Sequence, residues 1–438
     1  HHFHFRYIIK TMSKEILKLQ NGSDIRGVAI EGVEGEDVTL TANSAAKIGK
    51  AFVEWFCKRT GKKAENLKIG LGRDSRITGP SLLNAMSCGI LSTGANVVRC
   101  ELATTPAMFM SIVFEQTKFD ASAMITASHL PFNRNGIKLF NADGGLEHDD
   151  ITEILEIAAE ISDDDADNIL DKMLEKSNDA PRFDLLSIYA EHLKTAIVKG
   201  CGNEKPLTGL HIVVDSGNGA SGFFVDKILQ PLGANTEGSQ FLEPDGMFPN
   251  HIPNPENKEA MKAIQEAVLE NKADLGLIFD TDVDRMSAVF ADGSEINRDS
   301  IIALISAILA PEYPGSTIIT DSVTSDRLTY FLQDVLGLKH LCYMRGYKNV
   351  INKQKELNAK GEVSPLAMET SGHGALKDNY FLDDGAFLAV KLIIALANAN
   401  KEGKRLESLI EKLPPLVEEG EYRFKINTED FKAYGKDV

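Results

Sequence analysis

The sequence has few cysteines, and they form no pattern. The 438 residues include five cysteines, an odd number, scattered at positions 57, 88, 100, 201 and 342 without a CxxC pair. Disulfide frameworks and structural zinc sites need paired or closely spaced cysteines. We therefore expect free thiols and predict a cytoplasmic protein, with an organelle stroma as the alternative.

Basic charge and long apolar segments are scarce as well. The formal net charge is −17, whereas proteins that bind a nucleic-acid backbone carry a basic surface. The most apolar segment, "IIALISAILA" at 301–310, has about half of the ~20 residues that a membrane-spanning helix needs. We expect neither a nucleic-acid nor a membrane partner and interpret this segment as a buried helix. An acidic chain can still bind small phosphorylated ligands through a local group of Arg and Lys, and nothing indicates an oligomeric state.

What the sequence contains is a recurring strand–loop–helix unit. A strand at 67–71 is followed by a polar loop and by a helix that Pro80 opens. The same plan recurs at 209–229 and 315–332, and a strand ends in an acidic loop at 274–285. Strands that alternate with amphipathic helices predict α/β layers with parallel sheets. In such sheets ligands bind beyond the carboxyl ends of the strands, where these loops fall.

The length calls for more than one hydrophobic core, because single cores stop growing at about 250–300 residues. Acidic, hairpin-like and Pro-containing connections place divisions near 180, 296 and 413. We predict domains at 12–180, 181–296 and 297–413, followed by a short segment at 414–438. Residues 1–11 are left out of the fold, because Met12 resembles a natural start.

"FDTDVDR" is the strongest local motif. It places Asp280, Asp282 and Asp284 at alternate positions just after a predicted strand, a spacing that can direct three oxygens at one hard cation such as Mg²⁺. An EF-hand loop would need Gly and Glu where Arg285 and Ala291 stand. Two alternatives stay open: an acidic solvated turn, and a haloacid-dehalogenase-type site in which Asp280 is an aspartyl nucleophile.

A serine motif lies at "TASHLPFNRNGIK", residues 126–138. Ser128 is not in a Gly-x-Ser-x-Gly elbow, so ester hydrolysis is not indicated. His129 shares its backbone and can point away, which weakens a Ser–His dyad. A serine that carries a phosphoryl group instead needs a metal and cationic groups to hold the charge, and the chain supplies both.

Several loops carry groups suited to a phosphorylated sugar. Guanidinium groups, which bind phosphate with two hydrogen bonds, occur in "DIRG" (Arg26) and "RDSR" (Arg73 and Arg76). The loop "METSGHGAL" at 368–376 offers a carboxylate, a hydroxyl and an imidazole that suit sugar hydroxyls. Each motif alone is weak, since most such arginines only bridge surface carboxylates.

In this order, the four motifs resemble the α-D-phosphohexomutase superfamily. The order is an N-terminal arginine loop, "TASHLP" with "NGIK", "DTDVDR" and "ETSGH", and the resemblance covers residues 21 to about 413. It implies three consecutive α/β domains with mixed, largely parallel sheets around a central cleft, plus the start of a truncated fourth domain. It also implies phosphoryl transfer through a phosphoserine and a bisphosphorylated sugar.

The resemblance implies roles for individual residues. Ser128 would be the phosphoserine and, with Asp280, Asp282 and Asp284, would bind Mg²⁺. Lys138 and His373 would carry the proton of the sugar hydroxyl, a lysine only if burial or neighbours depress its pKa. Arg26 would act beside the serine. The implied substrate-binding residues are Arg73, Arg76, His129, Arg285, Arg345, Lys348, Glu369 and Ser371.

The expected function is interconversion of hexose 1-phosphate and hexose 6-phosphate, with glucose or mannose as the sugar and hexose 1,6-bisphosphate as activator. Phosphoglucosamine mutase and an impaired sugar-phosphate-binding protein are the alternatives. Leu130 and Thr281 replace the usual Asn and Gly. The sequence has no second Arg-Ser-x-Thr phosphate loop, so we expect a truncated record or an impaired enzyme.

Overall fold

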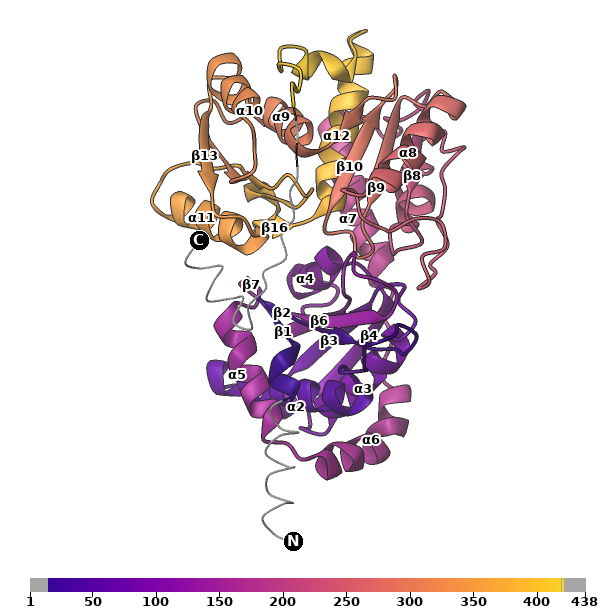
Figure 1. Ribbon diagram of the computed structural model, residues 1–438, viewed down its shortest axis with the longest axis vertical. Coiled ribbons are helices and arrows are strands. Elements are labelled where there is room, and N and C mark those ends of the chain that lie inside the picture. Colours follow the sequence, from indigo (N-terminus) through magenta and orange to yellow (C-terminus); the bar gives the residue numbers. More distant parts are fainter. Residues whose placement is uncertain (1–14, 419, 421–438) are drawn as a thin grey trace.

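The computed structural model describes residues 15–418 and residue 420. The chain forms three α/β domains, each built on its own mixed sheet (Figure 1). The first domain is in the lower half of that view, and the second and third lie side by side above it. The predicted fold class is confirmed for these three domains, whereas most of the predicted fourth-domain fragment at 414–438 lies outside the described residues.

The first domain has the largest sheet, in the order β1-β2-β6-β5-β3-β4, with β7 paired to β6. Strands β5, β3 and β4, at one end of the sheet, are parallel, and β6 runs antiparallel to β5. The strands are β1 (Gln20–Asn21), β2 (Asp24–Val28), β3 (Lys68–Arg73), β4 (Asn96–Leu102), β5 (Ala121–Ile125), β6 (Arg134–Asn141) and β7 (Gly144–Gly145). The helices are η1 (Ile16–Leu19), α2 (Ala42–Thr60), η2 (Ala64–Asn66), α3 (Gly79–Leu91), α4 (Thr105–Val113), α5 (His148–Ala159) and α6 (Asp163–Asn178).

The two faces of this sheet belong to different cores. Helices α2, α3 and α5 cover one face and form a core confined to the first domain. Helix α4 covers the other face and joins a core that continues into both other domains. The first domain is therefore docked on the rest of the molecule through α4.

The second domain has a four-stranded sheet, β11-β10-β9-β8, in which β8 and β9 are parallel. Helix α8 packs on one face of it, and α7 and η3 contribute to the shared core on the other. The elements are α7 (Leu185–Cys201), β8 (Ile212–Asp215), η3 (Val225–Leu229, one π-helical turn), α8 (Lys258–Asn271), β9 (Leu275–Phe279), β10 (Met286–Phe290) and β11 (Glu295–Ile296).

The third domain has the order β13-β12-β14-β15-β16, with parallel strands only around β12. Helix α11 packs on one face, and α9 and α12 join the shared core. The elements are α9 (Arg298–Leu309), β12 (Thr317–Asp321), α10 (Asp326–Tyr330), η4 (Phe331–Val335), β13 (Lys339–Tyr343), α11 (Tyr347–Ala359), β14 (Leu366–Met368), β15 (Gly374–Leu376), η5 (Lys377–Asn379), β16 (Leu382–Asp383), α12 (Gly385–Lys401) and η6 (Leu406–Ile410).

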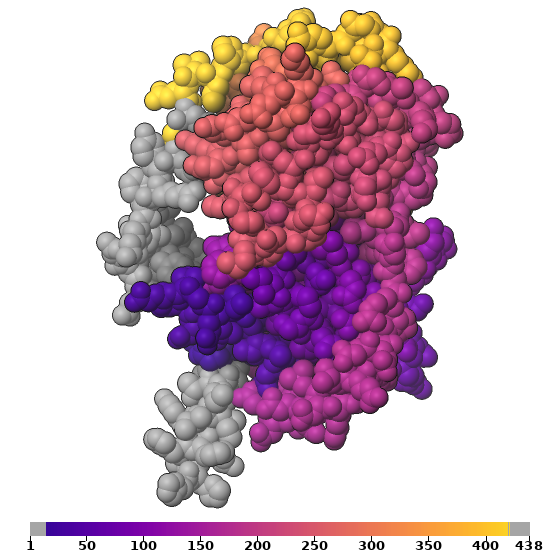
Figure 2. Space-filling view, turned by 90° about the vertical axis from the view of Figure 1, so that its right-hand side faces the viewer, coloured from indigo at the N-terminus to yellow at the C-terminus, as the bar shows by residue number. Residues whose placement is uncertain are grey.

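Helices α7 and α12 tie the second and third domains together. The buried hydroxyl of Tyr189 in α7 donates to Asp384, the N-cap of α12, at 2.6 Å. Figure 2 shows the chain running up one side from the first domain to the second, which lies directly on it. Among the described helices, none combines the length and apolar character that a membrane crossing requires.

Candidate active site

The three aspartates of the acidic loop converge at one point. The loop joins β9 to β10, whose ends Phe279 and Met286 pair directly, so it is a tight connection. The carboxylates of Asp280, Asp282 and Asp284 are buried and lie within 4.8 Å of one another. Burial, and after it the charges of the other two aspartates, raises the pKa of Asp280 well above its usual value. The cluster is therefore unfavourable as three bare anions.

The free oxygens of this cluster fit a divalent cation. Asp282 Oδ1 and Asp284 Oδ1 are buried and have no hydrogen-bond partner among the described residues. Their second oxygens are held, Asp284 Oδ2 by Lys138 Nζ at 2.7 Å and Asp282 Oδ2 by Thr105 of the first domain. Buried carboxylate oxygens without donors are costly unless a cation offsets their charge. An all-oxygen donor set suits a hard metal ion.

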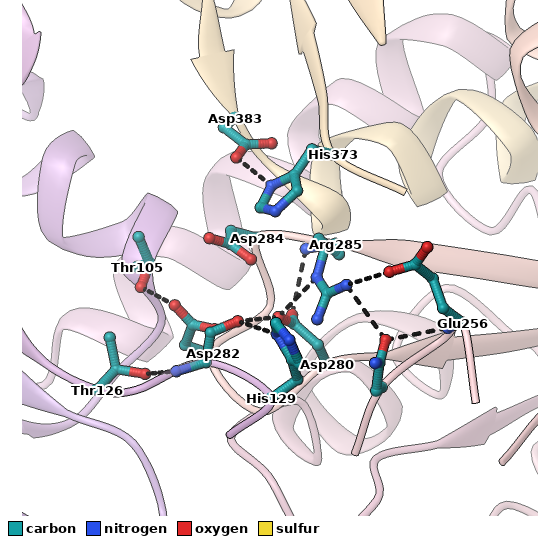
Figure 3. Close-up of polar contacts among 12 residues, drawn as sticks. Thr105, Thr126, His129, Glu256, Asp280, Asp282, Asp284, Arg285, His373 and Asp383 are labelled. Carbon is teal, nitrogen blue, oxygen red and sulfur yellow. Dashed lines mark hydrogen bonds and ion pairs between the residues drawn. The ribbon is translucent and has the colours of Figure 1, made fainter. Parts of the chain in front are cut away.

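Ser128 lies beside this cluster (Figure 3 shows the surrounding residues). It follows β5 in a turn and has a left-handed backbone with φ of 52°, a conformation that is uncommon outside glycine. Its Oγ donates to Asp280 Oδ2 at 2.9 Å. Burial, followed by the charges of Arg285 and Arg26, lowers the pKa of His129 to about 3, so this imidazole is neutral beside the serine.

Arg76 is placed differently from the sequence-based expectation of a substrate contact. Its guanidinium group is fully buried and donates to the carbonyls of Ser128, Leu130, Pro131 and Arg134. All of these carbonyls belong to the loop that carries Ser128. Arg76 therefore holds the serine loop in shape and does not face the cleft.

Arg73 and Arg26 also make intramolecular contacts. Arg73 donates to the carbonyl of Asp74 and lies 3.8 Å from Glu101 at the end of β4, so the structure does not bring it to the acidic cluster. Arg26 in β2 donates to Asp24 at 2.9 Å, and its buried Nε has no partner among the described residues. The buried Nε of Arg73 likewise has no hydrogen-bond partner among the described residues. Arg26 is thus available to an anion, and the substrate role expected for Arg73 stays a prediction.

Arg285 follows the third aspartate and is almost fully buried. Its Nε bonds Asp280 Oδ2 at 3.2 Å, and its Nη1 bonds Asn254 and Glu256, the latter at 3.4 Å. Its Nη2 is buried without a partner in the described part of the chain. A buried guanidinium nitrogen without an acceptor beside the serine is a donor prepared for an anionic ligand.

The sequence-based expectation is that Lys138 carries protons only if burial or neighbours depress its pKa. Burial alone would lower its pKa, but the charges of Asp284, Asp24 and Asp282 outweigh burial and raise the pKa of Lys138 well above its ordinary value. The ammonium group therefore stays charged and neutralises the aspartates. The condition attached to its role in proton transfer is not met.

His373 also has a raised pKa, but one that is still low enough for proton release. Its Nδ1 lies 2.5 Å from Asp383 Oδ2, and the ring of Tyr347 stacks on it with centroids 5.1 Å apart. Burial lowers its pKa, but the charges of Asp383 and Asp284 outweigh burial and raise the pKa of His373 to about 9. The imidazole is therefore protonated at neutral pH and can release that proton in the range where enzymes work.

The loops after β13 and β14 line a cavity of about 880 Å³ together with His129. Arg345 and Thr370 are among its lining residues. Glu369 is buried and accepts a hydrogen bond from the Gly346 amide at 2.6 Å. The hydroxyl of Ser371 is buried without a partner among the described residues. This side of the cleft offers the polar groups that a sugar needs.

Lys348 does not reach this cavity. It donates to the carbonyl of Gly145 at 2.5 Å and to Glu147 at 2.9 Å, both in the first domain. Asn352, one turn further along α11, donates to the same carboxylate. Lys348 thus forms a contact between the first and third domains, and the substrate contact expected for it stays a prediction.

Three residues at the site were not predicted from the sequence: Thr105, Tyr347 and Asp383. Tyr347 stacks on His373, and the Lys138 ammonium group lies 5.6 Å from its ring centroid. The sequence holds a weak signal for each, since Thr105 begins a Thr-Pro helix start and Tyr347 stands in the "RGYKNV" loop. Asp383 is one of two adjacent aspartates before α12, and nothing local tells which of them faces the histidine.

Comparisons with known proteins place this cleft in the class of sugar-phosphate mutases, the α-D-phosphohexomutases. Three family profiles match in chain order, all described as phosphoglucomutase/phosphomannomutase α/β/α domains: domain I at residues 17–165, domain II at 187–293 and domain III at 297–417. Together they cover well over half of the chain. The chain belongs to the phosphoglucomutase/phosphomannomutase family of isomerases. The exact divisions predicted near 180, 296 and 413 stay predictions.

Individual relatives agree with the family. A phosphomannomutase/phosphoglucomutase of Pseudomonas putida is 30% identical over 394 residues, covering 88% of this chain and 76% of that protein. A phosphoglucosamine mutase of Carboxydothermus hydrogenoformans is 30% identical over 391 residues, covering 88% and 81%. The crystal structure of a phosphoglucomutase/phosphomannomutase family protein from Burkholderia thailandensis matches with a TM-score of 0.68 at 28% identity, covering 92% of this chain and 80% of that one.

Proposed function

We propose that the protein interconverts the 1-phosphate and the 6-phosphate of a hexose, glucose or mannose, through a phosphoserine at Ser128 and a bisphosphorylated sugar. The observation that carries this proposal is the position of the Ser128 hydroxyl, 2.9 Å from Asp280 within a cluster of three buried aspartates. A hydroxyl so placed can hold a phosphoryl group next to a cation.

The transfer proceeds as two half-reactions. In the first, a sugar hydroxyl oxygen loses its proton and forms a bond to phosphorus, the bond from phosphorus to Ser128 Oγ breaks, Ser128 Oγ takes up a proton, and the bisphosphate results. After the sugar has turned around in the cleft, Ser128 Oγ loses that proton and bonds the other phosphorus, while the bond from that phosphorus to the sugar oxygen breaks and the sugar oxygen is protonated. Little covalent chemistry falls to the protein in such a transfer, so position and charge do most of the work.

The charge on the transferred group is met by cations from two domains. Arg285 Nη2, buried without a partner in the described structure, can donate to a phosphoryl oxygen. Lys138 adds a permanent positive charge at the same cluster. Mg²⁺ held by Asp280, Asp282, Asp284 and an oxygen on Ser128 would neutralise negative charge that develops on the transferred group.

His373 is the residue we assign to proton transfer. Its link to Asp383 fixes the ring orientation, and general acid–base help of this kind contributes ~10²–10⁴-fold. Glu369, Ser371 and Arg345 are assigned to the sugar and its distal phosphate, because Arg345 lines the cavity and Glu369 and Ser371 flank Thr370, which also lines it. Arg26 and His129 remain assigned to the neighbourhood of the serine.

Two alternatives stay in view. Phosphoglucosamine is the nearest one, because phosphoglucosamine mutases are among the relatives at similar identity. The haloacid-dehalogenase reading, with Asp280 as nucleophile, is disfavoured because Arg285 and Ser128 already occupy the oxygens of Asp280. The impaired binding protein and the cytoplasmic location stay predictions.

Labelling with [³²P]glucose 1,6-bisphosphate tests the proposal. We expect acid-stable label on Ser128 in the wild-type chain and, at most, about one part in a thousand of it in Ser128→Ala, because the acceptor oxygen is gone. Peptide mapping locates the label, and Ser122→Ala serves as a serine control on the preceding strand. Hydroxylamine-labile label on Asp280, or no label at all, contradicts the phosphoserine mechanism. Turnover assays with glucose, mannose and glucosamine phosphates then rank the sugars.

A further inference from the structure

The first domain holds one of the three aspartates of the second domain through the start of helix α4. Thr105, the first residue of α4, donates its hydroxyl to Asp282 Oδ2 and its backbone amide to the Asp282 carbonyl at 2.9 Å. Both residues are buried. In Figure 3 Thr105 approaches Asp282 from the side opposite to Arg285. One residue thus fixes both the backbone and the side chain of Asp282.

These contacts give the two oxygens of the Asp282 carboxylate different surroundings. A carboxylate accepts and cannot donate, so the single hydroxyl proton of Thr105 must point at Oδ2. Oδ1 is left buried and without a partner among the described residues. We propose that Thr105 is a positioning residue that aims Asp282 Oδ1 at the cation; this inference rests on the metal-dependent function proposed above.

The local sequence makes Thr105 a rigid support. Thr104 is the N-cap of α4, and its hydroxyl accepts the Ala107 amide at 3.1 Å. Pro106 occupies the first turn, where its fixed φ suits a helix. The helix itself packs against β5 and the shared core. The hydroxyl of Thr105 therefore cannot shift without moving α4.

The arrangement joins metal binding to the docking of domains. Thr105 belongs to the first domain and Asp282 to the second. Asp282 Oδ1 is therefore held toward the cation position while the two domains are in contact. A ligand that binds the docked form more tightly also stabilises it, and the coupling is reciprocal. The cation and the contact between the two domains therefore support each other.

The experiment measures the affinity of the full chain for Mn²⁺ alone, by electron paramagnetic resonance of free Mn²⁺, without substrate. We expect Thr105→Val to weaken Mn²⁺ binding by about 10–100-fold, the usual cost of losing an outer-shell partner of a metal ligand. Thr105→Ser keeps the hydroxyl and should stay within about threefold of wild type. Thr104→Val is the matched control, because it removes a cap from the same helix without touching Asp282.

The Thr104→Val control distinguishes loss of the orientation of Asp282 from general destabilisation of α4. We expect Thr104→Val to lower the melting temperature and to leave Mn²⁺ affinity unchanged. Equal Mn²⁺ affinity in wild type and Thr105→Val, or an equal loss in Thr104→Val, overturns the inference and leaves the proposed function standing. Absence of Mn²⁺ binding by the wild-type chain overturns the inference and the metal-dependent function together. Circular dichroism of each variant confirms that it is folded.

Discussion

At the scale of single residues, the site depends on ionisable side chains whose charges are set by their partners. Lys138 and His373 were both expected to move protons, yet their surroundings give them different tasks. Lys138 faces aspartates and stays charged. His373 is also cationic at neutral pH, but its pKa of about 9 is low enough for proton release during a reaction. The partner responsible is Asp383.

Replacing Asp383 by Asn should move the pH dependence of the reaction. In the half-reaction that returns a phosphoryl group to Ser128, protonated His373 supplies the proton of the departing sugar oxygen, so this step should slow as pH rises through about 9. Without the Asp383 charge the pKa of His373 falls, since a nearby opposite charge is worth roughly 1–3 pKa units. We therefore expect the alkaline limb of kcat against pH to move to lower pH by roughly that amount. Asp378→Asn, at an exposed carboxylate on the same segment, should leave the limb in place.

The same pair gives a second readout in stability. The folded pKa of His373 is raised above its unfolded value of about 6.5. Its stabilising contribution is therefore fully present below pH 6.5 and is lost as pH rises through about 9. The stability difference between wild type and Asp383→Asn should shrink over that range. A constant difference from pH 6 to 10 would show that Asp383 acts by packing alone.

At the scale of elements, one loop supports another. The loop between β3 and α3 carries Asp74 and Arg76, and the loop after β5 carries Ser128. Asp74 Oδ2 accepts from Thr126, whose hydroxyl accepts the Ser128 amide at 2.9 Å. Arg76 adds four bonds to carbonyls of the second loop. The left-handed backbone of Ser128 is thus held from outside its own loop.

Arg76→Lys should therefore damage both stability and turnover. An ammonium group cannot bond four carbonyls in one plane, and leaving buried acceptors unpaired costs about 1–3 kcal/mol. We expect unfolding free energy to drop by roughly that amount, and kcat to fall about 100-fold because the serine loses its position. Arg73→Lys, at the residue directly before Asp74 and partly exposed, should change each by far less. Equal effects of both substitutions would contradict the support role of Arg76.

The elements themselves were largely predictable, because their signals are local. The strand expected at 67–71 and the helix opened by Pro80 are β3 and α3, and the segment 301–310 lies in the buried helix α9. Parallel strands occur, but at one end of each sheet, with antiparallel strands completing the other end. The direction of Arg76 was not predictable, since spacing along a loop does not tell which backbone a long side chain will reach. The helix expected near 229 is a single π-helical turn.

At the scale of the whole molecule, the cleft is built where three domains meet, and several of the contacts between domains belong to the site. The first domain reaches the second through Ser128, Lys138 and Thr105. It reaches the third through helix α11, by way of Lys348 and Lys355. The order of the sequence motifs predicted that Ser128 and the three aspartates meet in the cleft, because proteins of the resembling family share that arrangement. Contacts between domains, such as that of Lys348 with Glu147, could not be predicted from the sequence, because they depend on how the domains pack against each other.

The role of Lys348 can be decided by changing each side of its contact with the first domain. If Lys348 serves this contact, Lys348→Met and Glu147→Gln should have the same small effects. The pair is partly exposed, with 19% of the lysine and 50% of the glutamate side chain accessible, so we expect at most about 1 kcal/mol of stability. KM for the sugar phosphate should stay within about twofold of wild type in both variants, because a 1.4 kcal/mol loss would be needed for tenfold. A substrate contact predicts instead a large rise of KM in Lys348→Met and none in Glu147→Gln. Measuring KM and chemical denaturation for both variants distinguishes the two roles, since a lysine that binds phosphate cannot be imitated by changing a glutamate of another domain.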